Sequence, residues 1–271
     1  GAQGGGLVRA ILDDRQGPFV ARALTRDVSS DKAKALAAQG VEVVAADVDD
    51  QASLERAFAG AHGAFCVTAF WEHFSAEREI AQARAMAAAA KRAGPHFDGK
   101  GEADRVFAEA GAPTTCLLTS FYWDNLIYFG MGPKPGADGT LEFTLPMGDA
   151  KLPGIAADDI GRCALGIFKR GGEFVGKTVG IAGEHLSGAE MAAALTKALG
   201  RPVRHNAVPP EVFRSFGFPG ADDLGNMFQF NRDFSKEFCA ARDLNFSRSL
   251  NPALQTFAAW LDRNAKRIPL E

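Results

Sequence analysis

Residues 19–60 read FVARALTRDVSSDKAKALAAQGVEVVAADVDDQASLERAFAG, and this stretch decides the fold. An apolar run at Phe19–Thr25 predicts a strand, and the valine-rich run Val41–Ala46 predicts a second one. Helical patterns are expected to follow them, over Asp31–Gln39 and over Gln51–Ala59. Such alternation of strand and helix indicates an α/β fold, a doubly wound and mostly parallel sheet with helices on both faces.

The ends of the two helices carry ordinary start and stop signals. Asp31 and Asp50 stand where an aspartate can cap a helix N-terminus by accepting a backbone N–H. Gly40 and Gly60 follow the helices at the position where a left-handed residue commonly ends one. We therefore expect Asp31 and Asp50 to be the caps.

The alternation continues outward from this stretch. Ala64–Thr68 predicts a short strand and Ala76–Ala93 a long helix, and the Phe-rich tail Pro210–Ile268 is predicted to be mostly helical. The remaining elements are expected as strands at Thr114–Leu118, Thr140–Leu145, Lys177–Ile181 and Pro202–Val208, and as helices at Asp158–Lys169 and Ser187–Leu199, the latter begun by a Ser187–Glu190 capping box.

Two places break the pattern. The chain begins at Gly1 without a strand before its glycine-rich start, although that strand is central in a doubly wound sheet. At Gly94–Pro95 a long helix is followed almost at once by the helix-like segment Asp98–Ala110, where a strand is due. We hypothesise that residues are absent at both points; the alternative at the second is a tight helix–helix connection.

Composition excludes several classes of function. The chain has 271 residues, a net charge of −3 and 46% hydrophobic residues, so a basic nucleic-acid binder is not indicated. No apolar run reaches the ~20 residues of a membrane span, so no membrane association is expected. The histidines show no ligand spacing, so no metal is expected. The cysteines are widely spaced, which favours reduced thiols and a cytoplasmic location: Cys66, Cys116, Cys163 and Cys239.

The glycine-rich start, Gly1–Gly6, runs into the helical apolar pattern Leu7–Leu12. Backbone N–H groups at such a helix start can approach a pyrophosphate, and the helix dipole favours that anion. A flexible terminus is the alternative. Together with the strand–helix alternation that follows, the pattern favours a nucleotide-binding site.

Charged residues follow the first two predicted strands. Arg26 stands where a Rossmann-like fold holds the adenosine ribose, and an arginine there accommodates the 2′-phosphate of NADP. Asp27 comes next, so a solvated charge pair is the alternative. Asp47 could reach an adenine or could be a turn aspartate.

Several motifs in fixed order resemble the NmrA-like family, a group of atypical short-chain dehydrogenase/reductases, and in particular its NADPH-sensing members. The start Gly1–Gly5 resembles the end of the family's G-x-x-G-x-x-G loop. The other motifs are Leu24-Thr25-Arg26, Asp47-Val48-Asp49-Asp50, Phe65-Cys66-Val67-Thr68-Ala69-Phe70-Trp71-Glu72, Phe97-Asp98-Gly99-Lys100-Gly101, Tyr122-Trp123-Asp124-Asn125 and the late run Gly217–Phe228.

The resemblance implies a Rossmann-like fold, an NADP(H) cofactor with NAD(H) as the alternative, and a role for each matching residue. The pyrophosphate would meet Gly1, Ala2, Gln3 and Gly4, and the 2′-phosphate would meet Arg26. Asp47 and Val48 would flank the adenine, and Thr68, Ala69 and Phe70 would lie along the cofactor. Lys100 would reach the nicotinamide ribose, and the loop of Tyr122, Trp123, Asp124 and Asn125 would lie beside the nicotinamide. Residues 1–120 with part of 150–182 would bind the dinucleotide, and residues 121–149 and 183–271 would form the smaller α/β C-terminal region.

Two departures from the family bear on function. Short-chain dehydrogenases use Tyr-x-x-x-Lys, but His96 stands four residues before Lys100 here and is a poor replacement for a phenol. The sensors also carry further basic residues after the arginine, where this chain has Asp27-Val28-Ser29-Ser30. These departures put standard catalysis by Lys100 and His96, and the preference for NADP over NAD, in question.

Two further groups have competing interpretations. The aromatic residues after two predicted strands could line a pocket or pack in the core: Phe70, Trp71, Phe74, Phe121, Tyr122 and Trp123. Asp158-Asp159 most simply caps the helix that follows. The leading prediction is a redox-sensing regulator that binds a nicotinamide dinucleotide and a regulatory protein partner. The alternatives are an NAD(P)H-dependent reductase of quinones or other carbonyl compounds, and a scaffold whose Rossmann loop is vestigial.

Overall fold

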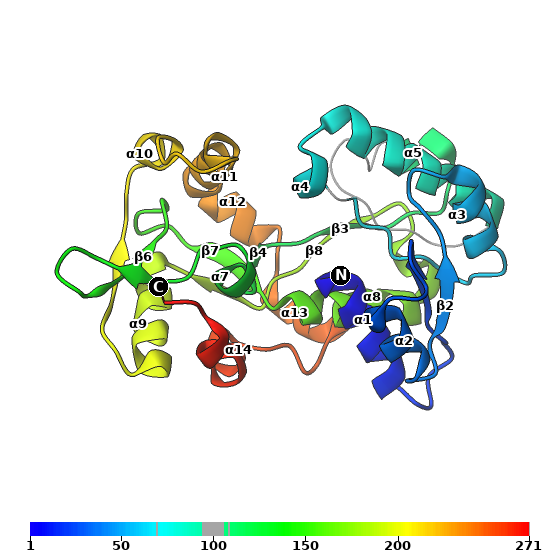
Figure 1. Cartoon of the computed structure of the whole chain (residues 1–271), viewed down its shortest axis with the longest axis horizontal. Helices are drawn as coiled ribbons and strands as arrows, with labels where there is room; N and C mark the ends of the chain where they lie inside the picture. The colour runs from blue at the N-terminus through cyan, green and yellow to red at the C-terminus, as the bar shows by residue number, and fades with distance from the viewer. Residues whose placement is uncertain (69, 94–105, 108, 271) are drawn as a thin grey trace. The chain divides into compact units, whose positions relative to one another are not determined.

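The computed structural model describes residues 1–68, 70–93, 106–107 and 109–270. The chain divides into two compact units (Figure 1). Unit 1 comprises Gly1–Leu118 and Gly161–Val179, and unit 2 comprises Thr119–Ile160 and Gly180–Glu271. One boundary therefore falls inside helix α8 (Ala157–Lys169).

A parallel strand pair opens unit 1. β1 (Arg22–Thr25) pairs with β2 (Glu42–Ala45), in register from Arg22 opposite Glu42 to Thr25 opposite Ala45. The Nε atom of Arg22 lies 2.8 Å from Oε2 of Glu42, so the first pair in the register is also an ion pair. β3 (Cys116–Leu118) pairs separately with β8 (Thr178–Gly180).

The core of unit 1 lies where α3 (Gln51–Phe58) packs on α5 (Ala76–Ala93). The inward face of α5 is built from small residues; Ala83, Ala89 and Ala90 are completely buried. Because alanine projects so little, the bulky side chains of α3 can approach the α5 backbone closely. The alanine-rich run of α5 is thus a packing surface.

Glycine permits a second close helix contact in unit 1. α1 (Ala2–Asp13) crosses α8 so closely that a Cβ added at Gly161 would lie 2.0 Å from the backbone nitrogen of Leu7. Arg162 Nη2 lies 2.9 Å from Oδ2 of Asp13, which adds an ion pair to the contact.

Unit 2 contains two small mixed sheets. In one, β7 (Leu152–Ile155) lies between β4 (Phe121–Tyr122), parallel to it, and β9 (Glu184–Leu186), antiparallel to it. In the other, β6 (Leu141–Thr144) lies between the parallel β10 (Val203–Asn206) and the antiparallel β5 (Lys134–Pro135).

Helices lie on both sides of the unit 2 strands. Within this unit, Figure 1 shows α10, α11 and α12 on one side, and α9 and α14 on the other. The core between them contains the buried residues Trp123, Phe143, Phe228, Phe257 and Trp260. The bounds of these helices and of the shorter elements are α9 Gly188–Leu199, α10 Pro210–Arg214, α11 Ala221–Asp233, α12 Ser235–Ala240, α13 Leu244–Leu250, α14 Phe257–Asn264, α2 Asp31–Ala37, α4 Phe70–His73, α7 Asn125–Tyr128, η1 Gly171–Phe174 and η2 Ala265–Arg267.

Two local predictions for unit 1 were wrong. Ser30, not Asp31, is the N-cap of α2; its hydroxyl accepts a hydrogen bond from the backbone N–H of Ala33 at 3.3 Å. In the segment 64–68, Cys66 and Thr68 are buried and Val67 between them is exposed, but the segment is not part of a strand ladder in the described chain. Alternation of burial alone does not make a strand, because a strand also needs a neighbour to hydrogen-bond with.

Candidate dinucleotide and reduction site

The N-terminus of α1 is open to solvent. Its N-cap, Gly1, makes no side-chain cap, and the first intrahelical bond runs from Gly5 N–H to the Gly1 carbonyl at 2.8 Å. Gly1 and Ala2 are exposed, and Gln3 and Gly4 are half-buried. A Cβ added at Gly1 or Gly4 would meet no atom within 4 Å. Open space at a helix N-terminus fits a pyrophosphate.

The glycines differ in one respect from the predicted loop. Helix α1 already begins at Ala2, so Gly4, Gly5 and Gly6 form its first turns. Gly6 is buried beneath the crossing with α8, near Gly161. A glycine there serves close helix packing, whereas Gly1–Gly4 line the open end.

Arg26 directly follows β1 and is exposed. It makes no hydrogen bond or ion pair with any other described residue. The neighbouring carboxylate is occupied: Oδ1 of Asp27 accepts hydrogen bonds from Ser29 N–H at 2.8 Å and from Ser29 Oγ at 2.6 Å. The hydroxyl and the backbone N–H of Ser29 hold the pKa of Asp27 below its ordinary value. The guanidinium of Arg26 is therefore available to an anionic ligand.

The loop after β2 is held by its own carboxylates. Oδ1 of Asp47 accepts the backbone N–H of Asp49 at 3.0 Å, so Asp47 has the geometry of a turn aspartate. Val48 packs, half-buried, against the unit 1 core. Asp49 accepts hydrogen bonds from Arg78 Nη2 at 2.6 Å and from Gln82 Nε2 at 3.0 Å, and these donors lower its pKa. The predicted adenine loop is thus anchored to α5.

The segment that was expected to run along the cofactor is only partly described. Thr68 is buried, and its Oγ1 donates to Oε1 of Glu79 at 2.6 Å, which ties the segment to α5. Phe70 begins α4. Ala69, His96 and Lys100 lie outside the described residues.

Unit 2 brings together a group of residues that the sequence did not connect. The hydroxyl of Tyr122 lies 2.9 Å from Oγ1 of Thr119. The carbonyl of Thr119 accepts a hydrogen bond from Nε of Arg242 at 2.8 Å. Nη1 of Arg242 donates to the carbonyl of Phe238 at 3.1 Å, and its guanidinium lies 3.6 Å from the centre of the Phe238 ring.

Arg242 is a buried cation, 6% exposed, with no carboxylate partner among the residues that the structure describes. Burial lowers its pKa to about 10. Nε2 of His185 donates to the Arg242 carbonyl at 2.9 Å, and burial lowers the pKa of His185 as well. A buried charge is costly unless hydrogen bonds compensate for the lost water. The carbonyls of Thr119 and Phe238, which accept hydrogen bonds from the guanidinium, are therefore essential to this arrangement.

The rest of the predicted nicotinamide loop has structural contacts. Trp123 is 1% exposed, and its ring centre lies 5.3 Å from that of Phe257. Oδ2 of Asp124 accepts the backbone N–H of Ala157 at 2.8 Å, at the start of α8. Asn125 is half-buried at the start of α7. Of the four loop side chains, Trp123 packs in the core, Asp124 makes this capping contact, and the hydroxyl of Tyr122 pairs with Thr119.

The aromatic residues for which the sequence left two interpretations include both buried and exposed side chains. Phe121 is buried with its ring centre 6.3 Å from that of Phe228, so Phe121 and Trp123 belong to the core of unit 2. Phe74 is 52% exposed and has a positive φ of 53°. Core packing, one of the two interpretations left open, therefore applies to Phe121 and Trp123.

Asp159 was predicted to be a helix cap, and this was wrong. The residue is 1% exposed and points into the unit 2 core, where Asn251 and Gln255 donate hydrogen bonds to it. Burial raises its pKa. The cap at this helix end comes from Asp124 instead, which a local sequence signal could not show.

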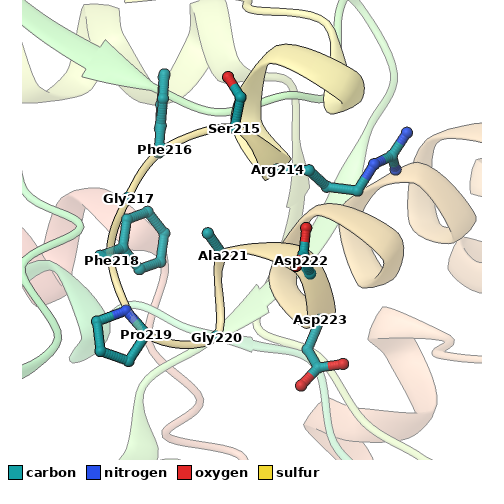
Figure 2. A pocket seen from close by; sticks show the side chains of 10 residues that line it. All are labelled: Arg214, Ser215, Phe216, Gly217, Phe218, Pro219, Gly220, Ala221, Asp222 and Asp223. Atoms are coloured by element: carbon teal, nitrogen blue, oxygen red, sulfur yellow. The ribbon is translucent and has the colours of Figure 1, made fainter.

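The late glycine- and proline-containing motif forms a hollow of about 540 Å³ in unit 2. Figure 2 shows the loop from Arg214 to Asp223 curving around this hollow, with the guanidinium of Arg214 directed away from its centre. Nη1 of Arg214 donates to Oε1 of Gln229 at 2.7 Å, which holds the loop against α11. The lining residues offer no cluster of catalytic groups.

Three further features bear on the chemistry. All four cysteines are free thiols. Among the described residues, His, Cys, Asp and Glu side chains form no group of three that could hold a metal ion. Over the same residues, no helix has the length and apolar character needed to cross a membrane.

The fold is that of an α/β, Rossmann-like protein, as the sequence predicted. Two solved structures superpose on nearly the whole chain: NmrA, a negative transcriptional regulator, in complex with NADP (TM-score 0.77, 22% identity, 97% of this chain and 91% of that one), and the triphenylmethane reductase of Citrobacter sp. complexed with NADP(H) (TM-score 0.76, 20% identity, 97% and 96%).

The chain belongs to the NmrA-like family, which it matches over residues 1–94 and 95–261. It is 31% identical over 230 residues to the NAD(P)H azoreductase of Xenophilus azovorans, covering 78% of this chain and 75% of the relative. It is 28% identical over 218 residues to quinone oxidoreductase 2 of Escherichia coli strain K12, covering 72% of each.

Proposed function

We propose that this chain is an NAD(P)H-dependent oxidoreductase that binds NADP(H) and reduces small conjugated acceptors such as quinones or azo compounds. The observation that carries the proposal is the exposed Arg26 at the end of β1, unpaired among the described residues, with the adjacent Asp27 carboxylate turned back into its own loop. An arginine at this position suits the 2′-phosphate that distinguishes NADP from NAD.

Each part of the dinucleotide has a candidate partner. The N–H groups of Gly1–Gly4 would hold the pyrophosphate, Asp47 and Val48 would flank the adenine, and Thr68, Ala69 and Phe70 would run beside the cofactor. Lys100 would hold the nicotinamide ribose. When bound, NADPH supplies a hydride. The protein's contribution is to bind the dinucleotide, to orient it, and to supply a proton to the reduced acceptor.

The names of the relatives support the choice of reaction. An NAD(P)H azoreductase and a quinone oxidoreductase both match more than two thirds of this chain. Their acceptors share a conjugated, electron-poor double bond that takes up a hydride and a proton. We extend this acceptor class to the present chain.

A redox-sensing regulator is the second candidate. It is favoured by His96, which stands four residues before Lys100 where a catalytic tyrosine would be needed. Such a regulator must bind oxidised and reduced cofactor with different consequences for a protein partner. NmrA itself, a negative transcriptional regulator, shares the fold.

A cofactor titration followed by a turnover assay tests the proposal. Calorimetry with NADPH, NADP⁺, NADH and NAD⁺ should give the tightest binding for the two phosphorylated forms. NADPH oxidation should then be seen with a quinone or azo acceptor, and Lys100→Ala should weaken it. Cofactor binding without turnover of any quinone, azo or aldehyde acceptor would favour the regulator, and absence of binding would refute both candidates.

A further inference from the structure

Helix α11 of unit 2 carries an apolar stripe on its exposed side. Met227, Phe230 and Phe234 are 38%, 55% and 49% exposed, whereas Phe228 is completely buried in the core. The rings of Phe230 and Phe234, the residue that directly follows the helix, have their centres 4.9 Å apart. Because residues three, four and seven apart lie on one face of a helix, the three exposed side chains form a continuous patch.

The N-terminal end of this stripe is acidic. Asp223 stands four residues before Met227 with Asp222 beside it, and both are exposed at the start of α11 (Figure 2). Neither aspartate forms an ion pair with another described residue, whereas Asp233 near the other end is paired with Nη2 of Arg232 at 2.9 Å. We call this surface the acidic face, and it consists of Asp222, Asp223, Met227, Phe230 and Phe234.

A second exposed aromatic surface lies at the end of α7. Tyr128 and Phe129 are 62% and 64% exposed, more than any other phenylalanine or tyrosine that the structure describes. Nη2 of Arg267 donates to the Tyr128 hydroxyl, and the guanidinium carbon lies 5.7 Å from the centre of the Tyr128 ring. Lys266, its neighbour in η2, is exposed as well. We call this surface the basic face, and it consists of Tyr128, Phe129, Lys266 and Arg267.

The composition of the two faces is that of interaction surfaces. Exposed apolar patches with a polar rim mark contacts with other molecules, and aromatic residues, methionine and arginine are enriched in such contacts. The faces also carry opposite charge, since two carboxylates stand on one and an ammonium and a guanidinium on the other. Neither cation is in an ion pair with a carboxylate of the described chain. Opposite charges across an interface speed encounter and fix its register, so each face offers what the other would recognise.

The two faces lie on opposite sides of unit 2. Figure 1 shows α11 on one side of the strands and α14 on the other. The turn η2 continues directly from α14 and contacts α9, which lies on that same side. One copy of the chain therefore cannot bring its own two faces together, whereas a second copy can supply the missing face.

We propose that copies of this chain associate head to tail, with the acidic face of one copy on the basic face of the next. The two aspartates then meet Lys266 and Arg267, and the aromatic rings of the two faces pack on one another. Such a contact is heterologous, so a pair of copies still has one free face of each kind. Association therefore continues beyond the dimer, to a ring or an open chain.

Sedimentation equilibrium of the full chain tests this association. The weight-average mass should rise with protein concentration and pass that of a dimer. Because the charged groups are at the surface, raising NaCl from about 50 mM to about 500 mM should weaken association about fivefold. A protein that stays monomeric up to near-millimolar concentration, or a mass that levels off at the dimer, would overturn the proposal.

Charge reversal tests the pairing of the faces. The double variant Asp222→Lys, Asp223→Lys should associate about tenfold more weakly than wild type, because like charges then face each other. The double variant Lys266→Glu, Arg267→Glu should do the same. Each of them retains one intact face, so a mixture of the two should associate again. Two variants that stay apart in the mixture would contradict the pairing of the acidic face with the basic face.

Matched controls separate a contact from an effect of net charge. The double variant Asp149→Lys, Glu173→Lys makes the same change in charge at exposed carboxylates outside both faces and should associate like wild type. Phe230→Ser should weaken association about tenfold through lost apolar burial. Val20→Ser, at a valine that is 93% exposed, is its control and should have no effect. Equal weakening in a variant and its control would refute the contact. All these positions are exposed, so the Tm should stay close to that of wild type.

Hydrogen exchange shows which surfaces become covered. Backbone amides within 222–234 and within 264–267 should both exchange more slowly at high than at low protein concentration. Slower exchange at one of the two segments alone would mean that this face pairs with its own copy, and it would overturn the head-to-tail arrangement.

Discussion

Nδ2 of Asn251 donates a hydrogen bond to Oδ1 of Asp159 at 3.0 Å, joining the tail to α8 across 92 residues of chain. Gln255 adds two more donors to the same carboxylate, its backbone N–H at 2.9 Å and its Nε2 at 3.2 Å. The carboxylate is thus one of the points at which the C-terminal segment is attached to the strand–helix part of unit 2.

Replacing Asp159 by alanine should therefore destabilise unit 2. Three donors would lose their acceptor in a buried site, and the free energy of unfolding should fall by about 3 kcal/mol. Urea denaturation measures the loss. Asp262→Ala, an exposed aspartate of α14, is the control and should change stability by less than about 0.5 kcal/mol. Similar losses in both variants would contradict this role for Asp159.

The same carboxylate should give stability a recognisable pH dependence. Burial raises the pKa of Asp159, so the folded state binds this proton more tightly than the unfolded chain does. Its contribution to stability is then greatest in acid and falls as the pH rises from about 4, the unfolded value, through the raised pKa.

Urea denaturation between about pH 4 and pH 7 checks this sign, with Asp159→Asn as the reference because the amide does not titrate. The stability of the wild type relative to Asp159→Asn should decrease as the pH rises. A difference that grows with pH would mean that the hydrogen bonds, rather than burial, dominate the pKa.

Close backbone contact makes Gly161 the most sensitive glycine of the α1–α8 crossing. A Cβ there would lie 2.0 Å from the Leu7 nitrogen, so Gly161→Ala must separate the helices and should cost about 3 kcal/mol. Gly172→Ala is the matched control, because a Cβ at Gly172 meets nothing within 4 Å. Thermal unfolding should show a large decrease in Tm for the first variant and almost none for the second.

The sequence predicted best those elements whose signals are local. The bounds of α5, Ala76–Ala93, were predicted to the residue, because its composition strongly favours a helix throughout. The Ser187–Glu190 capping box is confirmed, with both reciprocal hydrogen bonds present. Each of these patterns is complete within a few residues.

Elements that depend on distant partners were missed. β7 contains Pro153 and Gly154, which argue against a strand, yet its four residues are buried. It pairs with β9 along Leu152–Gly154 and with β4 along Gly154–Ile155. A Cβ at Gly154 would lie 2.3 Å from Nε1 of Trp123, so a glycine is needed there for packing. β4 and β9 have two and three residues, too few for a periodic signal.

In the candidate site, too, local features could be predicted from the sequence and long-range contacts could not. The position of Arg26 directly after a strand could be predicted, because it is a matter of sequence order. The capture of Asp27 by Ser29 follows from an aspartate two residues before a serine in a turn, a signal that was present but not used. The contact of Arg242 with Thr119 spans 123 residues and needs the folded chain to bring the two together.

Arg26 offers the most direct test of cofactor choice. Arg26→Ala removes one charge-assisted contact to the 2′-phosphate, which should cost about 1–3 kcal/mol for NADPH and little for NADH, which lacks that phosphate. Calorimetry should show NADPH affinity falling by about 10- to 100-fold while NADH affinity stays within about twofold.

Lys32→Ala, which removes an exposed cation from α2, is the control for a general loss of positive charge and should change neither affinity appreciably. Because Asp27 is already held by Ser29, its carboxylate should not take over the adenosine ribose when Arg26 is removed. Equal losses of NADPH and NADH affinity would place Arg26 away from the 2′-phosphate.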